Sequence, residues 1–140
     1  MAGFEYRYKL SGGVPTVQSV VSGLTAWKKG DMAIKGASST ALLGATGSAT
    51  FLGAVLADYS GLSAGTDKID VIVDPDAVYA VADASARNIG ATLDISGATG
   101  AQTVATSSNK EFLVVATKNN SSENTLVKFN VGKQIHNVAV

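Results

Sequence analysis

The sequence predicts an all-β protein, a small single-domain β-barrel or β-sandwich with an extended N-terminal arm. Two observations favour this fold class. Short segments rich in Val, Ile and Leu recur along the chain, and stretches of Gly, Ala, Ser and Thr separate them. The chain has 140 residues, the size of one ordinary domain. It contains no cysteine, which excludes a disulfide framework and thiolate metal sites.

The N-terminal segment 4–10 has the pattern of a strand with one apolar face. Its apolar and charged residues alternate: Phe4, Tyr6, Tyr8 and Leu10 against Glu5, Arg7 and Lys9. We interpret residues 1–16 as an arm that lays its aromatic face on another subunit, by strand addition or by filling a groove. The alternative is an ordinary first strand of the domain's own sheet.

The body of the domain is predicted at residues 17–132, and its first half contains three strand candidates. They begin at Val17, at Met32 after the turn signal Lys29-Gly30-Asp31, and at Phe51, where an apolar run extends to Leu56. Residues 36–50 are mostly small and surround a Leu42-Leu43 pair. We expect a hairpin or a long loop there.

Residues 68–74 form the clearest strand candidate. Ile69, Val71 and Val73 share one face, and Asp70, Ile72 and Asp74 share the other. Residues 75–87 fit two structures, because Asp74-Pro75-Asp76 is equally a helix start and a turn. We favour a strand over a helix because the surrounding segments are β.

The second half of the domain contains three further strand candidates. Residues 89–95 form a strand in which Gly90 marks a bulge, and residues 112–116 are continuously apolar, which indicates cover on both faces. Residues 125–131 alternate, with Val127, Phe129 and Val131 on one face. Between these segments we expect a small-residue loop at 96–108 and a polar hairpin tip at 118–124. Residues 133–140 form a C-terminal tail.

Catalytic chemistry is not predicted. His136 is the only histidine and falls in the tail, so no base accompanies a nucleophile. The Gly44–Gly47 and Gly97–Gly100 segments lack the lysine and the spacing of phosphate-binding loops, and we interpret them as flexible loops. We therefore expect a protein that is not an enzyme, with no catalytic residue, no metal ligand and no cofactor.

Aspartates and one tryptophan are the remaining candidates for a binding site. The aspartates cluster in the sequence: Asp67, Asp70, Asp74, Asp76 and Asp83. We interpret these aspartates as residues of turns and solvated strand edges. Calcium binding by their carboxylates is the functional alternative. Trp27 beside Lys28-Lys29 fits a core or interface position, or a stacking site. Together these residues leave open a calcium- or carbohydrate-binding β module.

Net charge and hydropathy limit the kinds of partner that the chain is expected to bind. Eleven basic and eleven acidic side chains give a net charge of zero, whereas nucleic-acid binding needs a basic excess. The N-terminus does not have the pattern of a signal peptide, and no apolar run is long enough to span a bilayer. We expect a protein made in the cytoplasm that binds neither nucleic acid nor membrane.

One ordered set of motifs resembles a known family. Val71-Ile72-Val73-Asp74-Pro75-Asp76-Ala77-Val78-Tyr79 leads to Asn88–Ile95, Glu111–Ala116, a polar tip at Asn119–Asn124 and Thr125–Asn130. This order resembles the small head-decoration (cement) proteins of tailed bacteriophages. In these proteins a V-x-x-x-P-D-x-V-Y strand precedes I-G-x-x-x-D-I, an apolar strand, a hairpin and a closing strand. Lys29-Gly30-Asp31 followed by Phe51–Val55 is also similar. The likeness covers roughly residues 25–131, and the residues before about 20 match no pattern of the family.

The resemblance implies a protein on the outside of a virion. Made in the host cytoplasm, it would bind the major capsid protein as a homotrimer and stabilise the head. The residues expected to contact a partner are Phe4, Tyr6, Tyr8, Leu10 and Trp27. The alternative is another virion part, such as a tail-tube, fibre or head-fibre module.

Overall fold

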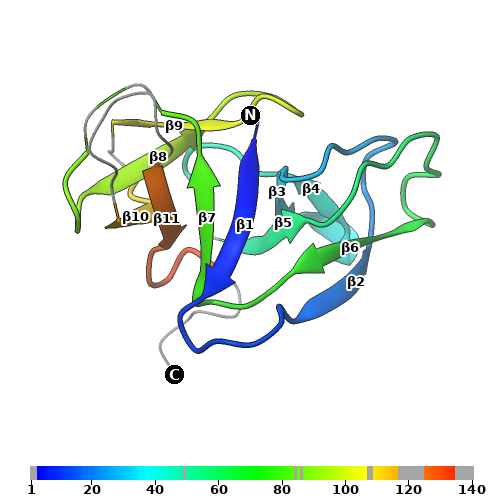
Figure 1. The fold of residues 1–140 in the computed structure, drawn as a ribbon. Coiled ribbons are helices and arrows are strands. Elements are labelled where there is room, and N and C mark those ends of the chain that lie inside the picture. The colour runs from blue at the N-terminus through cyan, green and yellow to red at the C-terminus, as the bar shows by residue number, and fades with distance from the viewer. Residues whose placement is uncertain are drawn as a thin grey trace.

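The computed structural model describes residues 3–48, 50–83, 85, 87–106, 109–116 and 125–134. They form two antiparallel β-sheets, an arrangement consistent with a β-sandwich (Figure 1). This confirms the predicted all-β class. No helix in these ranges is long and apolar enough to cross a membrane.

The first sheet contains six strands in the order β1-β7-β11-β10-β8-β9. Their bounds are β1 (Phe4–Lys9), β7 (Ala77–Val81), β8 (Thr92–Ser96), β9 (Thr103–Thr106), β10 (Phe112–Ala116) and β11 (Thr125–Phe129). The strands β1 and β9 form the two edges of this sheet. The chain therefore enters the fold at an edge.

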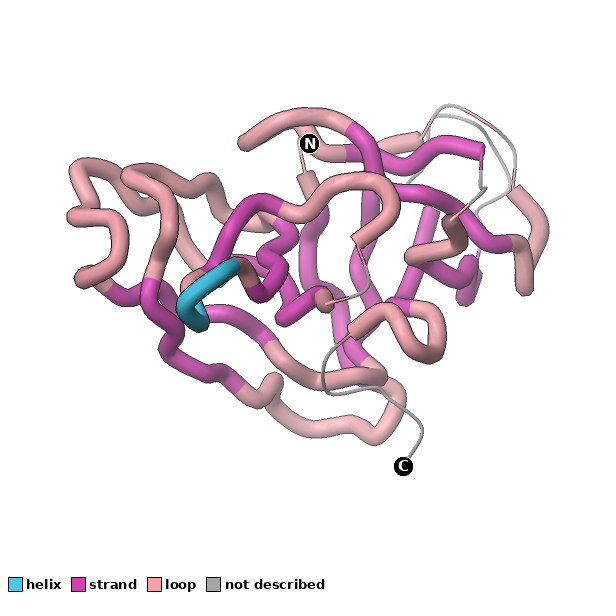
Figure 2. The backbone as a smooth tube through the Cα atoms, turned by 180° about the vertical axis from the view of Figure 1, so that it is seen from behind, coloured by secondary structure: helices cyan, strands magenta, loops and turns pink. Residues whose placement is uncertain are grey.

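The second sheet contains five strands in the order β2-β6-β5-β3-β4. Their bounds are β2 (Val17–Val21), β3 (Met32–Lys35), β4 (Ala41–Leu43), β5 (Phe51–Val55) and β6 (Lys68–Ile72). A short 3-10 turn, Ala37–Ser39, joins β3 to β4 and is the cyan segment of Figure 2. The strands β3 and β4 pair, so the hairpin begins before the predicted range of 36–50, in which β4 is the only strand among the described residues.

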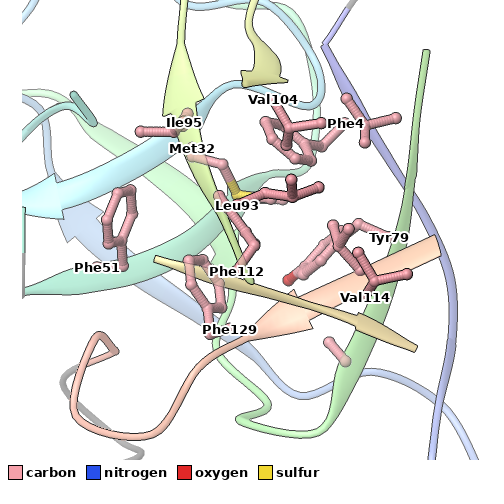
Figure 3. Close-up of a cluster of buried hydrophobic side chains, with 14 of the residues drawn as sticks. Phe4, Met32, Phe51, Tyr79, Leu93, Ile95, Val104, Phe112, Val114 and Phe129 are labelled. Carbon is pink, nitrogen blue, oxygen red and sulfur yellow. The ribbon is translucent and has the colours of Figure 1, made fainter. Parts of the chain in front are cut away.

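An aromatic cluster fills the space between the two sheets (Figure 3). Phe112 stacks on Phe129 and on Phe4, with ring centroids 5.0 Å apart in both pairs. Phe51 reaches this cluster from the second sheet, 5.2 Å from Phe129. Since offset and tilted aromatic pairs add to the stabilisation from burial, these rings hold the sheets together.

A second apolar cluster covers the other face of the second sheet. Ile69, Val71 and Val73 belong to it, whereas Ile72 belongs to the aromatic cluster. The alternation predicted for 68–74 is therefore confirmed, and β6 contributes apolar side chains to both clusters. Trp27 closes this second cluster, and its main chain pairs with that of Tyr59.

One close approach within the second sheet requires a glycine. Gly53 has a φ of +151°, and a Cβ at this position would lie 1.6 Å from the carbonyl oxygen of Ile72. Any larger residue would push β5 away from β6. The glycine therefore permits the two strands to lie side by side.

The segment 4–9 corrects the expectation of an extended arm. As β1 it pairs with β7 of the same chain, with Phe4 opposite Val81 and Lys9 opposite Ala77. A bulge between Tyr6 and Tyr8 shifts the register. Because a bulge reverses which face the following side chains occupy, the predicted apolar face does not continue through Tyr8.

Other predictions in the chain have mixed outcomes. Residues 77–81 form a strand, so the favoured strand interpretation is confirmed over the helix for this part of 75–87. The predicted loop 96–108 contains β9, which the sequence analysis missed. The predicted strand 89–95 begins only at Thr92, because Gly90 lies in a turn with a φ of +86°. The hairpin tip 118–124 and most of the tail, including His136, lie outside the described residues.

Candidate functional site

Two of the five predicted partner-binding residues belong to the core. Phe4 is buried between the sheets, and Trp27 is fully buried in the second cluster. The indole N–H of Trp27 donates to the Ser22 hydroxyl oxygen at 2.8 Å. In the described fold neither side chain offers a surface to a partner, which corrects these two assignments.

Tyr6 lies half-buried between the core and the surface. Its ring packs edge-on against Tyr79, with centroids 6.2 Å apart. Its hydroxyl is buried and has no hydrogen-bond partner among the described residues. Burial raises the pKa of Tyr6, and the nearby Asp74 carboxylate raises it further, so the hydroxyl stays protonated at neutral pH.

Tyr8 and Leu10 are exposed and form part of a longer apolar segment. The exposed fractions are 43% for Tyr8, 55% for Leu10, 83% for Val14 and 43% for Val17. These are four of the seven exposed large hydrophobic residues in the described ranges. We call residues 8–17 the β1–β2 corner, which runs along the bottom of Figure 1. Val14 and Val17 were not among the predicted partner-binding residues, because the alternating pattern that pointed to a contact ends at Leu10.

The Asp74-Pro75-Asp76 turn holds this corner in place. The Thr16 N–H donates to Asp74 Oδ2 at 2.6 Å, and the Lys9 ammonium lies 3.4 Å from Asp74 Oδ1. The Ser11 N–H donates to Asp76 Oδ2 at 2.8 Å. A hydrogen bond from the Ser11 side chain is the largest cause of the lowered pKa of Asp76, and the main-chain bond lowers the pKa further. Since charge-assisted hydrogen bonds are stronger than neutral ones, the two carboxylates fix both ends of the loop.

A groove of about 400 Å³ lies beside the corner, between β1 and the second sheet. Phe4–Tyr6 and Pro15 line one side, and Ala54–Leu56 and Ile72 line the other. The strand β1 pairs only with β7, so its second edge faces this groove. At the start of the strand Gly30 occupies that edge, because the Phe4 N–H donates to the Gly30 carbonyl oxygen at 3.2 Å.

The clustered aspartates have separate partners and do not converge. The Asp67 carboxylate accepts from Ser63, that of Asp70 from Ser19, and that of Asp83 from Arg87. Asp67, Asp74, Asp76 and Asp83 lie outside the strands, as expected, whereas Asp70 lies within β6, which pairs with a strand on each side. In the part of the chain that the structure describes, no three acidic or histidine side chains lie close enough to hold a metal ion.

The comparisons with known proteins complete the description of the site. No family model matches this chain, and no curated protein matches it. The candidate site consists of the β1–β2 corner, the groove beside it and the Asp74-Pro75-Asp76 turn, whose carboxylates hold the corner in place. Exposed apolar side chains lie along the corner, and the hydrogen bonds to Asp74 and Asp76 hold its main chain in place.

Proposed function

We propose that this chain is a non-enzymatic structural protein of a phage head, which binds the outside of the capsid and stabilises it. The observation that carries the proposal is the β1–β2 corner, where Tyr8, Leu10 and Val14 are exposed on a loop fixed at both ends. The order of motifs from Val71 to Asn130, with its likeness to decoration proteins, supports the same function. The proposed partners are the major capsid protein and further copies of this chain, as a homotrimer.

An exposed apolar surface on a fixed loop is suited to binding. Clustered exposed apolar residues are typical of interaction sites. Burial of one such side chain contributes about 2 kcal/mol. Because the hydrogen bonds to Asp74 and Asp76 already order the loop, binding loses little further conformational entropy. A protein that binds only the assembled shell stabilises that shell by mass action.

Co-sedimentation with undecorated phage heads tests the proposal. The test variant carries Tyr8→Ser, Leu10→Ser and Val14→Ser. The control carries Ile89→Ser and Val131→Ser, because these apolar residues are also exposed, at 70% and 65%, and lie elsewhere in the chain. We expect saturable pelleting of the wild type and the control, and at least about a tenfold loss of affinity for the test variant.

The possible outcomes separate the function from the site. Pelleting of all three proteins with equal affinity would support the proposed function, and it would show that the contact with the capsid lies outside the corner. Pelleting of none would contradict decoration. Light scattering of the free protein measures its oligomeric state in solution. A protein that is monomeric both in solution and when bound to the head would contradict the homotrimer.

The second candidate is a tail-tube, fibre or head-fibre module. The observation that favours it is that β1 and β2 are both edge strands and are joined by the corner. Sheet edges permit strand addition between copies, and repeated addition builds a ring or a rod. Rings or filaments in electron micrographs of the purified protein would favour this candidate over decoration.

A further inference from the structure

Two buried carboxyl groups face each other on neighbouring strands, away from the candidate site. Phe112 of β10 pairs with Leu93 of β8, and Leu113 pairs with Thr92. The same antiparallel register places Glu111 opposite Asp94, so that the two side chains project to one side of the pair. Glu111 is fully buried and Asp94 nearly so. Two like charges at such a position repel each other.

Main-chain donors surround this pair. Asp94 Oδ1 accepts from the Asn109 N–H at 2.9 Å and from the Lys110 N–H at 2.7 Å. Glu111 Oε1 accepts from the Gly47 N–H at 2.7 Å. Glu111 Oε2 is buried, and no donor in the described ranges reaches it. A carboxyl oxygen in this position, beside another carboxyl group, is satisfied when it carries a proton.

The elements around Glu111 supply little opposing charge. The 44–48 loop and β9 contain no ionisable side chain. The charged groups on the other neighbouring segments are Asp94, Lys110 and Lys128, and Lys110 is exposed and contributes its main-chain N–H. Burial raises the pKa of Glu111 above its ordinary value, the Gly47 N–H partly opposes this, and a hydrogen bond with Asp94 and the charge of Asp94 raise the pKa further.

We propose that Glu111 and Asp94 share one proton in the folded protein, and that this pair is a pH-sensitive latch. Glu111 connects β10 to the 44–48 loop through the Gly47 N–H, and the Thr46 hydroxyl in the same loop donates to the Ile95 carbonyl oxygen. Asp94 connects β8 to the 109–110 turn. The shared proton thus joins a loop of the second sheet to two strands of the first. This inference does not depend on the proposed function.

The direction of the pH effect follows from the raised pKa of Glu111. Below the ordinary value of 4.5 the carboxyl group is protonated in both the folded and the unfolded chain, so the contribution of the latch to stability is complete. As the pH rises through the higher pKa of the folded state, the unfolded chain releases the proton more readily. The contribution to stability is therefore lost toward neutral and alkaline pH.

Thermal unfolding of the Glu111→Gln variant between about pH 4.5 and pH 8.5 tests the latch. Glutamine keeps the acceptor for Gly47 and places a permanent N–H donor toward Asp94. We expect the variant to unfold about 3 °C above the wild type at the alkaline end, with a difference that vanishes at the acid end. Glu5→Gln is the matched control, because it makes the same charge change on the surface and should follow the wild type throughout.

Three results would overturn the proposal. One is a Glu111→Gln variant that is less stable than the wild type at alkaline pH, or that differs equally at all pH values. Another comes from the wild type alone, if a carbon-13 titration of the Glu111 carboxyl gives a midpoint at or below its ordinary value. The third is a calcium-induced rise in the wild-type melting temperature that Glu111→Gln lacks, because it would assign a cation to the pair in place of the proton.

Discussion

Two pairs of carboxyl groups in this protein have opposite environments. Asp74 and Asp76 lie in a turn at the edge of the fold, and Asp94 and Glu111 lie buried between neighbouring strands. The main-chain N–H groups of Ser11 and Thr16 donate to Asp76 and Asp74. Hydrogen bonds from the side chain of Ser11 first, and from its main chain second, lower the pKa of Asp76. Burial raises the pKa of Glu111. The same chemical group therefore stabilises the fold as an anion in one region and as a neutral acid in the other.

The difference comes from what each carboxyl group has lost and gained on folding. At the turn, each carboxylate exchanges water for hydrogen bonds with loop N–H groups, and Asp74 also gains the Lys9 ammonium. At Glu111 the Gly47 N–H satisfies one oxygen only, and the group opposite is another carboxyl. Desolvation without a full set of donors disfavours the charged form.

The largest effect is expected from Asp94→Ala at about pH 4, below the ordinary value of 4.5, where the raised pKa keeps Glu111 protonated. The N–H groups of Asn109 and Lys110 both lose their acceptor in a largely buried position. The free energy of unfolding should fall by about 3 kcal/mol, as measured by urea denaturation. A fall smaller than that of Asp74→Ala would contradict the view that the buried pair contributes more to stability.

Asp74→Ala should cost about 2 kcal/mol, because the Thr16 N–H and the Lys9 ammonium lose their partner. Asp74→Asn is the matched variant. It should cost less, since the amide oxygen still accepts from Thr16. Hydrogen exchange of the Thr16 amide should accelerate in Asp74→Ala and change little in Asp74→Asn. Equal exchange in both variants would show that another contact holds the corner.

The pH dependence of Asp76 should be opposite to that of Glu111. Because the pKa of Asp76 is lowered on folding, its contribution is present above the ordinary value of 3.8 and is lost as the pH falls through the lower folded value. At neutral pH, Asp76→Asn should therefore be less stable than the wild type by about 1 kcal/mol. Thermal unfolding at a series of pH values measures this, and a difference that grows toward acid pH would contradict the assignment.

The smallest effect on stability is expected at the exposed side chains of the corner. Leu10→Ser and Val14→Ser remove no buried contact, so the free energy of unfolding should change by less than about 0.5 kcal/mol. Chemical denaturation measures this difference. A larger loss would show that these side chains stabilise the monomer, and it would weaken their proposed role in binding.

Local patterns predicted much of the fold. Alternation at 68–74 identified which residues of β6 share a face, and the continuous apolar run at 112–116 identified β10. The strand β9 was missed because Thr103–Thr106 contains few large apolar residues. It pairs only with β8, at the edge of the sheet, where an apolar pattern is not required.

The candidate site depended more on tertiary structure. Alternation placed Phe4, Tyr6 and Tyr8 on one face, but the bulge in the pairing with β7 left Phe4 in the core and Tyr8 in solvent. A bulge depends on the partner strand, which lies far away in the sequence. For the same reason the pattern of residues 8–17 did not predict that Asp74 and Asp76 hold the corner in place.

The sequence by itself determined the all-β class, the positions of most strands and the supply of apolar side chains, because these depend on periodicities and turn residues that act locally. Only the tertiary structure decided which carboxyl groups accept hydrogen bonds from N–H donors alone and which lie next to another carboxyl group. The opposition of Glu111 and Asp94 comes from the register of β8 and β10, and the pairing of Thr16 with Asp74 comes from the way the chain folds back. Hydrogen bonding and desolvation act between groups close in space, so their result is set only when the strands have paired.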